Sequence, residues 1–433
     1  MNFVNFIQNA RQAGHLVVQP RMGFGAIEPM QAGLRAVKAA NATKVGTITL
    51  DSYTRVGDHD SARKALAEGR DLNGFPIVAH GQEATRAMLA GIQDETFPIQ
   101  VRHGCPLPVD IFRALIDSGT DATEGGPASY CLPYSRTPLS EAIKAWRTCC
   151  LMLSDQAEEG RVIHLESFGG CMLGQLCPPE LLVAISVLEC IFFQTYGVKS
   201  VSMSYAQGTN LAQDISAISA MRRLASERLH VDWHVVLYTY MGVFPKTILG
   251  ATDLLSESIC LAVNGGAERV IVKTPAEAHR IPTVQENVGA LEHAFMYSKS
   301  QELRDRVMPA PFDGDVYEQA NRIIESVLEL DTDISQALAK AFKRGLIDVP
   351  FCLHTDNPKR SRSFIDTDGT LRWLNVGSMA ISSKGGSTQR NSIRPYDFLE
   401  MLSFVQQHFD KPYWETQGQT LGGPSPAAIS AKQ

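Results

Sequence analysis

Residues 98–134 read PIQVRHGCPLPVDIFRALIDSGTDATEGGPASYCLPY, and this stretch decides the fold. A short apolar run ends in the polar cluster 102–104, a helical pattern follows over 109–118, and a second polar cluster begins at Thr123. A strand that ends in polar residues, then a helix, then another polar strand end is typical of a parallel α/β barrel. In that fold the functional side chains lie where the strands give way to loops.

The polar residues of this stretch are suited to holding a small zwitterion. Arg102 offers a fork that matches a carboxylate with two charge-assisted hydrogen bonds. Glu124 offers a carboxylate for an ammonium group, and Tyr130 and Tyr134 add oriented hydrogen bonds and exclude water. The alternative interpretation is a structural ion pair between Arg102 and Glu124, with the two tyrosines at an interface.

The rest of the chain repeats this alternation of short apolar runs and longer helical patterns. Nine segments have strand patterns: 15–19, 45–50, 73–81, 98–102, 123–124, 161–168, 200–205, 234–242 and 269–275. Helical patterns lie between them at 27–41, 60–69, 82–92, 109–118, 139–158, 179–195, 211–228 and 249–264. The pattern predicts the α/β class and a TIM-type (β/α)8 barrel. Such a barrel takes eight strands, so one of the nine candidates lies outside it or is irregular, and the sequence leaves open which.

The alternation ends near residue 300. We expect three regions: a barrel that carries the functional face over 1–300, a smaller C-terminal α+β extension over 301–412, and a disordered tail over 413–433. The extension has helical patterns at 301–345 and 395–408 and strand signals within 348–377. The tail is rich in Gly, Pro, Ser, Ala and Gln, a composition that favours disorder.

Composition excludes several functional classes. The 433-residue chain is 44% hydrophobic and carries a net charge of −6, which is ordinary for a soluble globular enzyme. It has no basic patch for nucleic acid, no apolar stretch long enough to span a membrane, and no signal-peptide pattern at its N-terminus. The nine cysteines include no Cys-x-x-Cys pair, so we predict no metal site and expect reduced, mostly buried thiols in a cytoplasmic protein.

Three arginines, Arg21, Arg55 and Arg102, follow predicted strands. If all three face the mouth of one barrel they need anionic partners, because clustered buried cations are costly alone. The chain offers three glutamates as partners: Glu124, Glu166 and Glu277. A ligand with two carboxylates is the other solution.

The sequence resembles a known family, the large (epsilon) subunit of glutamate mutase, also called methylaspartate mutase, from about Asn5 to about Ser378. The shared markers are Gln19-Pro20-Arg21, Asp51-x-Tyr53-Thr54-Arg55, Asn73-Gly74-Phe75-Pro76, Arg102-His103-Gly104, Glu124-Gly125-Gly126 with Ser129-Tyr130 and Pro133-Tyr134, Asn210 with Gln213-Asp214, Met241-Gly242 with Phe244-Pro245, and Val270-Ile271-Val272-Lys273-Thr274-Pro275 with Glu277-Ala278 and Ile281-Pro282-Thr283. No single marker is decisive, but together, in order and at compatible spacing, they are specific.

The resemblance implies a barrel that holds adenosylcobalamin against the carboxyl ends of its strands and interconverts L-glutamate and 3-methylaspartate by radical rearrangement. It implies that Arg21, Arg55 and Arg102 grip the two substrate carboxylates. Glu124 matches the residue that receives the substrate ammonium and acts as its base, and Tyr130 and Tyr134 match further substrate contacts. Positions that match the surroundings of the adenosyl group are Gly23, Asn73, Pro133, Lys273 and Glu277.

Two segments depart from the family pattern. Where the family usually has His-Gln-Trp before Met241-Gly242, this chain has Tyr238-Thr239-Tyr240, and Ser167–Cys171 replace a Pro-x-x-Pro-Leu-Thr type of segment.

A partner subunit is also implied. The family's cobalamin is carried by a small subunit with an Asp-x-His-x-x-Gly motif, and Asp232-Trp233-His234 in this chain lacks the glycine. The resemblance therefore implies a small cobalamin-binding partner, in a heterotetramer built on a homodimer of the large subunit.

Two other functions stay open. A Schiff-base aldolase or lyase would use Lys273, because a desolvated lysine at a strand end attacks carbonyl groups. A non-catalytic barrel homologue would act as a scaffold for the cobalamin-binding partner. The retained arginines and Glu124 argue against the scaffold, which has no need of them.

Overall fold

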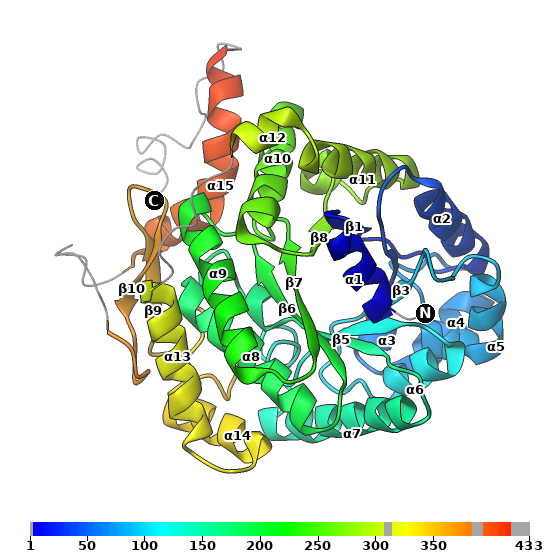
Figure 1. The fold of residues 1–433 in the computed structure, drawn as a ribbon, viewed down its shortest axis with the longest axis horizontal. Helices are drawn as coiled ribbons and strands as arrows, with labels where there is room; N and C mark the ends of the chain where they lie inside the picture. The colour runs from blue at the N-terminus through cyan, green and yellow to red at the C-terminus, as the bar shows by residue number, and fades with distance from the viewer. Residues whose placement is uncertain (1–2, 307–313, 383–392, 417–433) are drawn as a thin grey trace, which may run out of the picture.

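A computed structural model describes residues 3–306, 314–382 and 393–416. Eight parallel strands form a nearly closed barrel at its centre (Figure 1), in the order β1-β8-β7-β6-β5-β4-β3-β2. The strands are β1 Val17–Pro20, β2 Gly46–Thr49, β3 Ile99–Arg102, β4 Ala122–Gly125, β5 His164–Ser167, β6 Ser200–Ala206, β7 Asp232–Tyr238 and β8 Arg269–Val272. Two backbone hydrogen bonds of Val18, to Thr43 (2.9 Å) and from Val45 (3.2 Å), join β1 to the start of β2. The predicted (β/α)8 barrel is confirmed.

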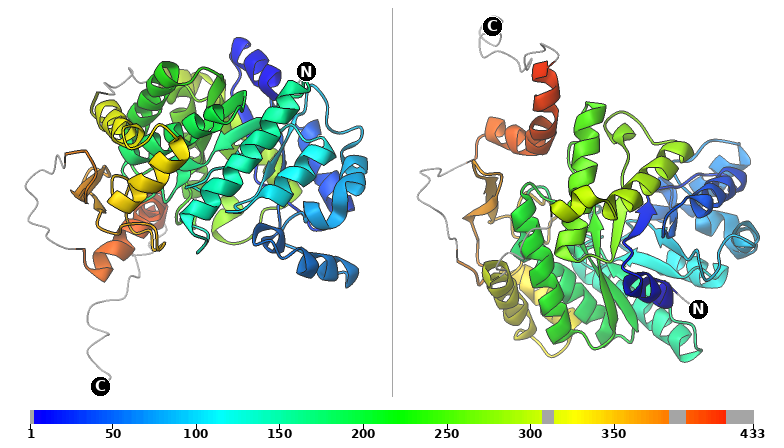
Figure 2. Two further views of the ribbon diagram at one scale, coloured as in Figure 1. Left: turned by 90° about the horizontal axis from the view of Figure 1, so that it is seen from below. Right: turned by 45° about the horizontal axis from the view of Figure 1, so that its top comes forward.

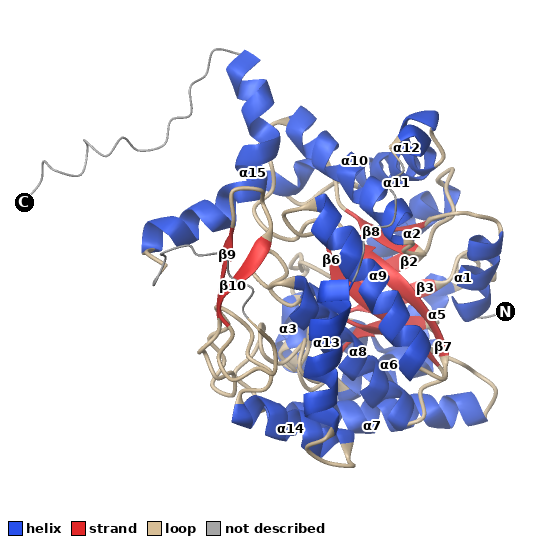
Figure 3. Ribbon diagram, turned by 60° about the vertical axis from the view of Figure 1, so that its left-hand side comes forward, coloured by secondary structure: helices blue, strands red, loops and turns tan. Residues whose placement is uncertain are grey.

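Helices surround the barrel and cover its outer face (Figure 3). Those that follow the strands are α2 Ile27–Ala39, α3 Ser52–Arg55, α4 His59–Ala67, α5 Ile77–Leu89, α6 Val109–Ser118, α7 Leu139–Glu158, α8 Pro179–Thr195, α9 Leu211–Arg228, α10 Ile248–Gly265 and α11 Val284–Ser298, with 3-10 turns at Gly169–Cys171 and Pro275–Ala278. The predictions for α6 to α9 agree residue for residue, because these long amphipathic or fully apolar segments are bounded by clear breakers.

Of the nine segments with strand patterns, the segment 73–81 is the one outside the barrel, and the prediction of a strand there is wrong. Phe75 makes only one isolated bridge, to Leu50, and the helix α5 begins at Ile77. The apolar run Ile77-Val78-Ala79 has a strand-like composition, but Pro76 at the N-cap starts a helical turn there. Gly81, at φ +79°, interrupts the helix and separates this first turn from the part that the sequence predicts.

A polar network fills the barrel below its mouth. Arg269 is fully buried and pairs with Glu166, and it also bonds to Gln19 and, at 3.0 Å, to Gln100. At the opposite end from the mouth, α1 (Phe3–Gln12) closes the barrel, and the ring of its Phe3 stacks on His164 with centroids 4.8 Å apart. The cavity at the mouth therefore has a closed floor.

Most of the C-terminal elements lie on one side of the barrel (Figure 2), whereas α12 packs against α11. The C-terminal elements are α12 Gln301–Asp305, α13 Gly314–Leu328, α14 Ile334–Arg344, the antiparallel strands β9 Arg362–Ile365 and β10 Leu371–Asn375, and α15 Pro395–Thr416. Asn210 and Gln213 bond to backbone carbonyls of the β9–β10 hairpin, so the hairpin is attached to the N-terminal end of α9. The helix α15 runs to Thr416, past the predicted boundary at residue 412; the rest of the predicted tail, 417–433, lies outside the described residues.

All nine cysteines are free and buried, as the sequence predicts. Within the described ranges, no helix is long and apolar enough to cross a membrane, and no group of three or more His, Cys, Asp or Glu side chains is placed to hold a metal ion.

Candidate active site

The structure brings the six predicted substrate residues together. Arg21, Arg55 and Arg102 follow or end three adjacent strands, β1, β2 and β3, and their side chains line one cavity of about 630 Å³ at the barrel mouth. The same cavity is lined by Glu124 at the end of β4 and by Tyr130 and Tyr134 from the loop after it.

Arg102 and Glu124 form a nearly buried ion pair on the cavity wall. Arg102 Nε donates to Glu124 Oε2 at 2.7 Å, and the two side chains are 7% and 2% exposed. Burial opposes the charge of Glu124, but the adjacent Arg102 and the donated hydrogen bonds hold its pKa below the usual range. Tyr130 donates to the other oxygen, Oε1. Since a carboxylate oxygen accepts two hydrogen bonds, Oε1 keeps capacity for a further donor such as an ammonium group.

Arg55 adds positive charge to the site. Its Nε donates to the Leu50 carbonyl at 2.8 Å, and in the part of the chain that the structure describes it makes no ion pair with a carboxylate. Burial lowers the pKa of Arg55, and the neighbouring Arg102 and Arg21 act in the same direction, while Tyr130 opposes them. A cation held in this way favours an anionic ligand.

A second charged cluster adjoins the first. Glu277 Oε1 accepts from Arg21 Nη1 and from Lys273 Nζ, each at 3.0 Å. Burial lowers the pKa of Lys273 to about 8, although Glu277 favours its charged form. Around the mouth, four cations, Arg21, Arg55, Arg102 and Lys273, therefore face two carboxylates, Glu124 and Glu277.

The three other predicted cofactor residues lie beside the cavity rather than on its wall. A Cβ at Gly23 would come under 3.0 Å from the Thr49 carbonyl oxygen. Only glycine therefore allows the loop after β1 to approach the end of β2 so closely. Asn73 Oδ1 accepts from the Ser52 backbone N–H at 3.0 Å and so supports the turn that carries Arg55. Pro133 is half-buried in the tyrosine loop. Their contacts with a cofactor stay predictions.

Tyr238 belongs to the site, and sequence reasoning missed it. Its hydroxyl donates to Glu124 Oε2 at 2.7 Å, also contacts Glu166, and receives from Arg102 Nη2 at 3.3 Å. It therefore connects the ion pair at the mouth with the polar network below. The signal was present: strand alternation puts Tyr238 on the inward face with His234.

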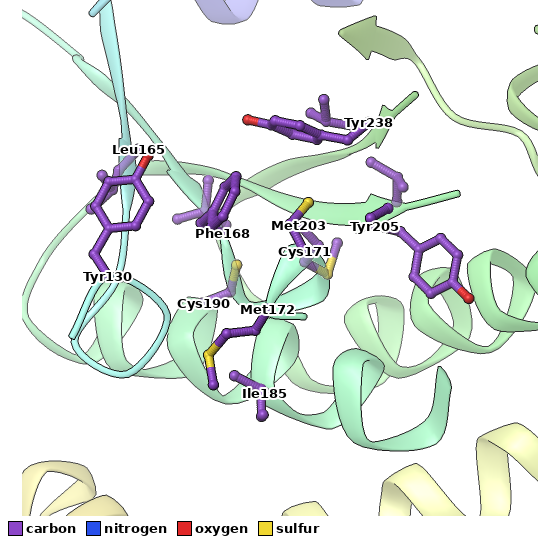
Figure 4. Packing of buried hydrophobic residues seen from close by; sticks show 14 of the residues in the cluster. Tyr130, Leu165, Phe168, Cys171, Met172, Ile185, Cys190, Met203, Tyr205 and Tyr238 are labelled. Carbon is purple, nitrogen blue, oxygen red and sulfur yellow. The ribbon is translucent and has the colours of Figure 1, made fainter. Parts of the chain in front are cut away.

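Phe168 and His103 complete the cavity wall, and neither was predicted. The ring of Phe168 lies between Tyr130 and Tyr238, with centroids 5.2 and 5.4 Å away (Figure 4). His103 lines the cavity, and burial lowers its pKa to about 3, so the ring is neutral at pH 7. Because its Nδ1 accepts from the Cys105 N–H at 3.1 Å, Nε2 carries the proton. Within the described residues Nε2 has no hydrogen-bond partner, and the atom itself is buried.

Together, fold and site define a parallel α/β-barrel protein with an arginine-rich cavity at the carboxyl ends of its strands. The family model described as methylaspartate mutase E chain (MutE) matches residues 1–396. The chain belongs to this family.

Curated relatives carry a consistent name. The chain is 31% identical to the glutamate mutase epsilon subunit of Yersinia enterocolitica over 398 residues, 88% of this chain and 81% of that protein. It is 30% identical to the glutamate mutase epsilon subunit of Desulfitobacterium hafniense over 443 residues, 98% of this chain and 90% of the relative. Among solved structures, the YdjI aldolase of Escherichia coli K12 is similar with a TM-score of 0.36 and 13% identity, covering 73% of this chain and 99% of the aldolase. That similarity is too low to carry an argument.

Proposed function

We propose that this chain is the substrate-binding, catalytic large subunit of an adenosylcobalamin-dependent glutamate mutase that rearranges L-glutamate to 3-methylaspartate. One observation carries the proposal: in a member of the mutase family, three arginines and one ordered glutamate line a single cavity. This combination suits two carboxylates and one ammonium, which is the charge pattern of an amino dicarboxylate.

The roles of the side chains follow from their contacts. Arg21 and Arg55 line the cavity and bind the ligand carboxylates. Arg102 assists them through Nη1, which makes no hydrogen bond within the described residues. Glu124 receives the ammonium on Oε1 and holds or takes its proton. A small flexible diacid gripped at both ends is fixed in one pose, and such orientation is a large part of catalysis.

The aromatic residues exclude water from this grip. Tyr130, which bonds to Glu124, and Phe168, which packs on Tyr130, are nearly buried, while Tyr134 is 53% exposed. A bound partner that covers Tyr134 would close the cavity, and a dry cavity protects reactive intermediates.

Several residues fit the adenosyl group of the cofactor. Glu277 is 23% exposed, and within the described chain its Oε2 takes no hydrogen bond, so it can accept from ribose hydroxyls beside Lys273. Adenosylcobalamin, when bound, supplies the radical chemistry that the protein side chains lack. Large apolar side chains exposed after β2, β7 and β8 suit a flat macrocycle and a covering partner: Val56, Val243 and Ile281 on loops, and Ile248 at the start of α10.

A small cobalamin-binding subunit completes the proposal. His234, in the segment nearest to the partner's motif, is buried at the α1 end of the barrel and stacks on His164 with centroids 4.7 Å apart. It therefore does not face the mouth, and the cobalt ligand has to come from elsewhere. Adenosylcobalamin should bind tightly only when the purified chain is mixed with an Asp-x-His-x-x-Gly subunit; tight binding to this chain alone would refute the two-component assembly.

The Schiff-base alternative depends on Lys273. Its lowered pKa of about 8 favours the neutral amine more than an ordinary lysine does. However, its Nζ is 3.0 Å from Glu277 Oε1, and at pH 7 the group is mainly protonated and a poor nucleophile. We expect borohydride treatment with a keto acid to trap no adduct; a covalent adduct on Lys273 would establish the alternative.

Calorimetric titration with matched ligands tests the substrate class. L-Glutamate carries both carboxylates and the ammonium, glutarate lacks the ammonium, and 4-aminobutyrate lacks one carboxylate. The proposal predicts that L-glutamate binds most tightly and that both analogues bind at least about tenfold more weakly, because each leaves a buried charged group without its partner. Equal affinity for all three would refute an amino dicarboxylate site.

A further inference from the structure

Glu189, on the helix α8, is a buried carboxylate without a cation. Its side chain is fully buried, and within the described ranges no Lys, Arg or His pairs with it. Oε1 accepts from the backbone N–H groups of Ala128 (3.1 Å) and Ser129 (2.9 Å). Oε2 accepts from the hydroxyls of Ser129 (2.9 Å) and Ser167 (2.8 Å). Each oxygen thus has two donors, which fills its hydrogen-bonding capacity.

This arrangement is costly for packing alone. A buried carboxylate loses its hydration and is tolerated only when hydrogen bonds replace the water. Burial raises the pKa of Glu189 to about 7, and α8 is otherwise buried mainly through apolar residues. The approach also restricts the facing loop, since a Cβ at Gly126 would come under 3.0 Å from the Glu189 carboxyl group.

The donors belong to two loops that carry the aromatic residues of the site. Ala128 and Ser129 begin the turn that positions Tyr130, whose backbone N–H bonds to the Gly126 carbonyl at 3.1 Å. The hydroxyl of Tyr130 donates to Glu124 Oε1. Ser167 ends β5 and precedes Phe168, which packs on Tyr130; Figure 4 shows these rings above α8. Glu189 therefore connects the loop after β4 to the end of β5 through hydrogen bonds from the helix α8.

We propose that Glu189 is a positioning residue for the ammonium subsite: its carboxylate fixes the Tyr130 loop so that the Tyr130 hydroxyl holds Glu124 in the orientation that receives the ligand ammonium. The inference rests on the proposed function, because it assumes that Glu124 binds an ammonium group. It goes beyond it by assigning control of that subsite to a residue that does not touch the ligand.

Two substitutions separate this role from packing. Glu189→Met keeps the length and approximate volume of the side chain but removes both acceptors. Glu189→Gln keeps one oxygen for the two backbone N–H groups, and its amide can donate to serine hydroxyls that rotate to accept. The matched control is Glu180→Met on the same helix, since Glu180 is also buried but bonds to the Trp373 indole of β10, away from the cavity.

The readout is the ratio of L-glutamate affinity to glutarate affinity, measured by calorimetry on the full chain. We expect Glu189→Met to lower this ratio about tenfold, and Glu189→Gln and Glu180→Met to leave it within about twofold of the wild type. An unchanged ratio in folded Glu189→Met protein would overturn the inference. If wild-type protein binds neither ligand, the proposed function fails instead, so the two failures are distinguishable.

A double-mutant cycle with Tyr130→Phe tests whether Glu189 acts through Tyr130. We expect the effects on the affinity ratio to be non-additive: the ratio of the double variant should be no lower than that of the more affected single variant. The reason is that both changes interrupt the same chain of contacts. Effects that multiply fully would show an independent, merely structural role. If Glu189→Met does not fold, Ser129→Ala replaces it in the cycle; this removes one donor to the carboxylate, and the same non-additivity is required.

Discussion

Replacing Arg102 by lysine should weaken L-glutamate binding while the fold survives. Arg102 donates from Nε to Glu124 at 2.7 Å and from Nη2 to Tyr238 at 3.3 Å, and it lines the cavity. Within the described residues its Nη1 makes no hydrogen bond. Lysine keeps the positive charge but has a single ammonium, which cannot hold Glu124 and a ligand carboxylate in the planar arrangement that the guanidinium provides.

The size of the effect follows from the hydrogen bonds that a lysine at this position cannot make. One charge-assisted hydrogen bond is worth about 1.5–3 kcal/mol, and the Arg102 side chain is only 7% exposed, so solvent does not replace the bond. The absence of one such bond to the ligand corresponds to about a 10- to 150-fold increase in Kd. The pair with Glu124 persists in part, because lysine still neutralises that carboxylate.

Calorimetric titration of L-glutamate into the wild type and the Arg102→Lys variant measures the change. Arg161→Lys is the control: Arg161 is partly buried and bonds to the carbonyls of Ile116 and Thr120, at the end of the barrel away from the cavity. It should lower the melting temperature without changing Kd. An unchanged Kd in a folded Arg102→Lys variant would refute the assignment of Arg102 to a ligand carboxylate.

Three further predictions concern the same mouth. Glu124→Gln should weaken L-glutamate binding at least about tenfold but leave glutarate binding within about threefold, because only glutamate places an ammonium on this residue; equal losses for both ligands would contradict the assignment. Lys273 is charged below its pKa of about 8 and neutral above it, so L-glutamate affinity should fall as the pH rises through about 8, and Lys273→Met should flatten this step in the titration series. Gly126→Ala should destabilise the fold by about 1–3 kcal/mol through its clash with the Glu189 carboxyl group, whereas Gly289→Ala, in open space on α11, should be neutral or stabilising in thermal denaturation.

The barrel could be predicted from the sequence because its signals are local. The helices α6 to α9 show their period and their breakers within their own residues, and the strands between them are short apolar runs. Reliance on local signals also explains the wrong prediction of a strand within 73–81. The apolar, β-branched composition of this segment favours a strand, but tertiary packing makes Ile77 the start of a helix.

The site was predictable only in part. Arg21, Arg55, Arg102 and Glu124 end or follow strands, and a barrel brings all strand ends to one mouth. Tyr238 is the last residue of β7, but the sequence predicts that this strand runs on to residue 242, so Tyr238 was not recognised as a strand end. Glu189 lies within the helix α8, where a polar residue gives no local sign of the partner it meets. The contacts of Glu189 join residues about sixty positions apart in the chain, and only the folded structure reveals such pairings.

The most direct test of the central claim is the reaction itself. The purified chain, adenosylcobalamin, L-glutamate and a small Asp-x-His-x-x-Gly subunit are combined, and 3-methylaspartate is followed by proton nuclear magnetic resonance through its new methyl signal. The account predicts that this signal grows only when both proteins and the cofactor are present, and that Arg102→Lys reduces its rate by at least about tenfold. No methyl signal from the complete mixture, although cobalamin and L-glutamate both bind, would contradict the account.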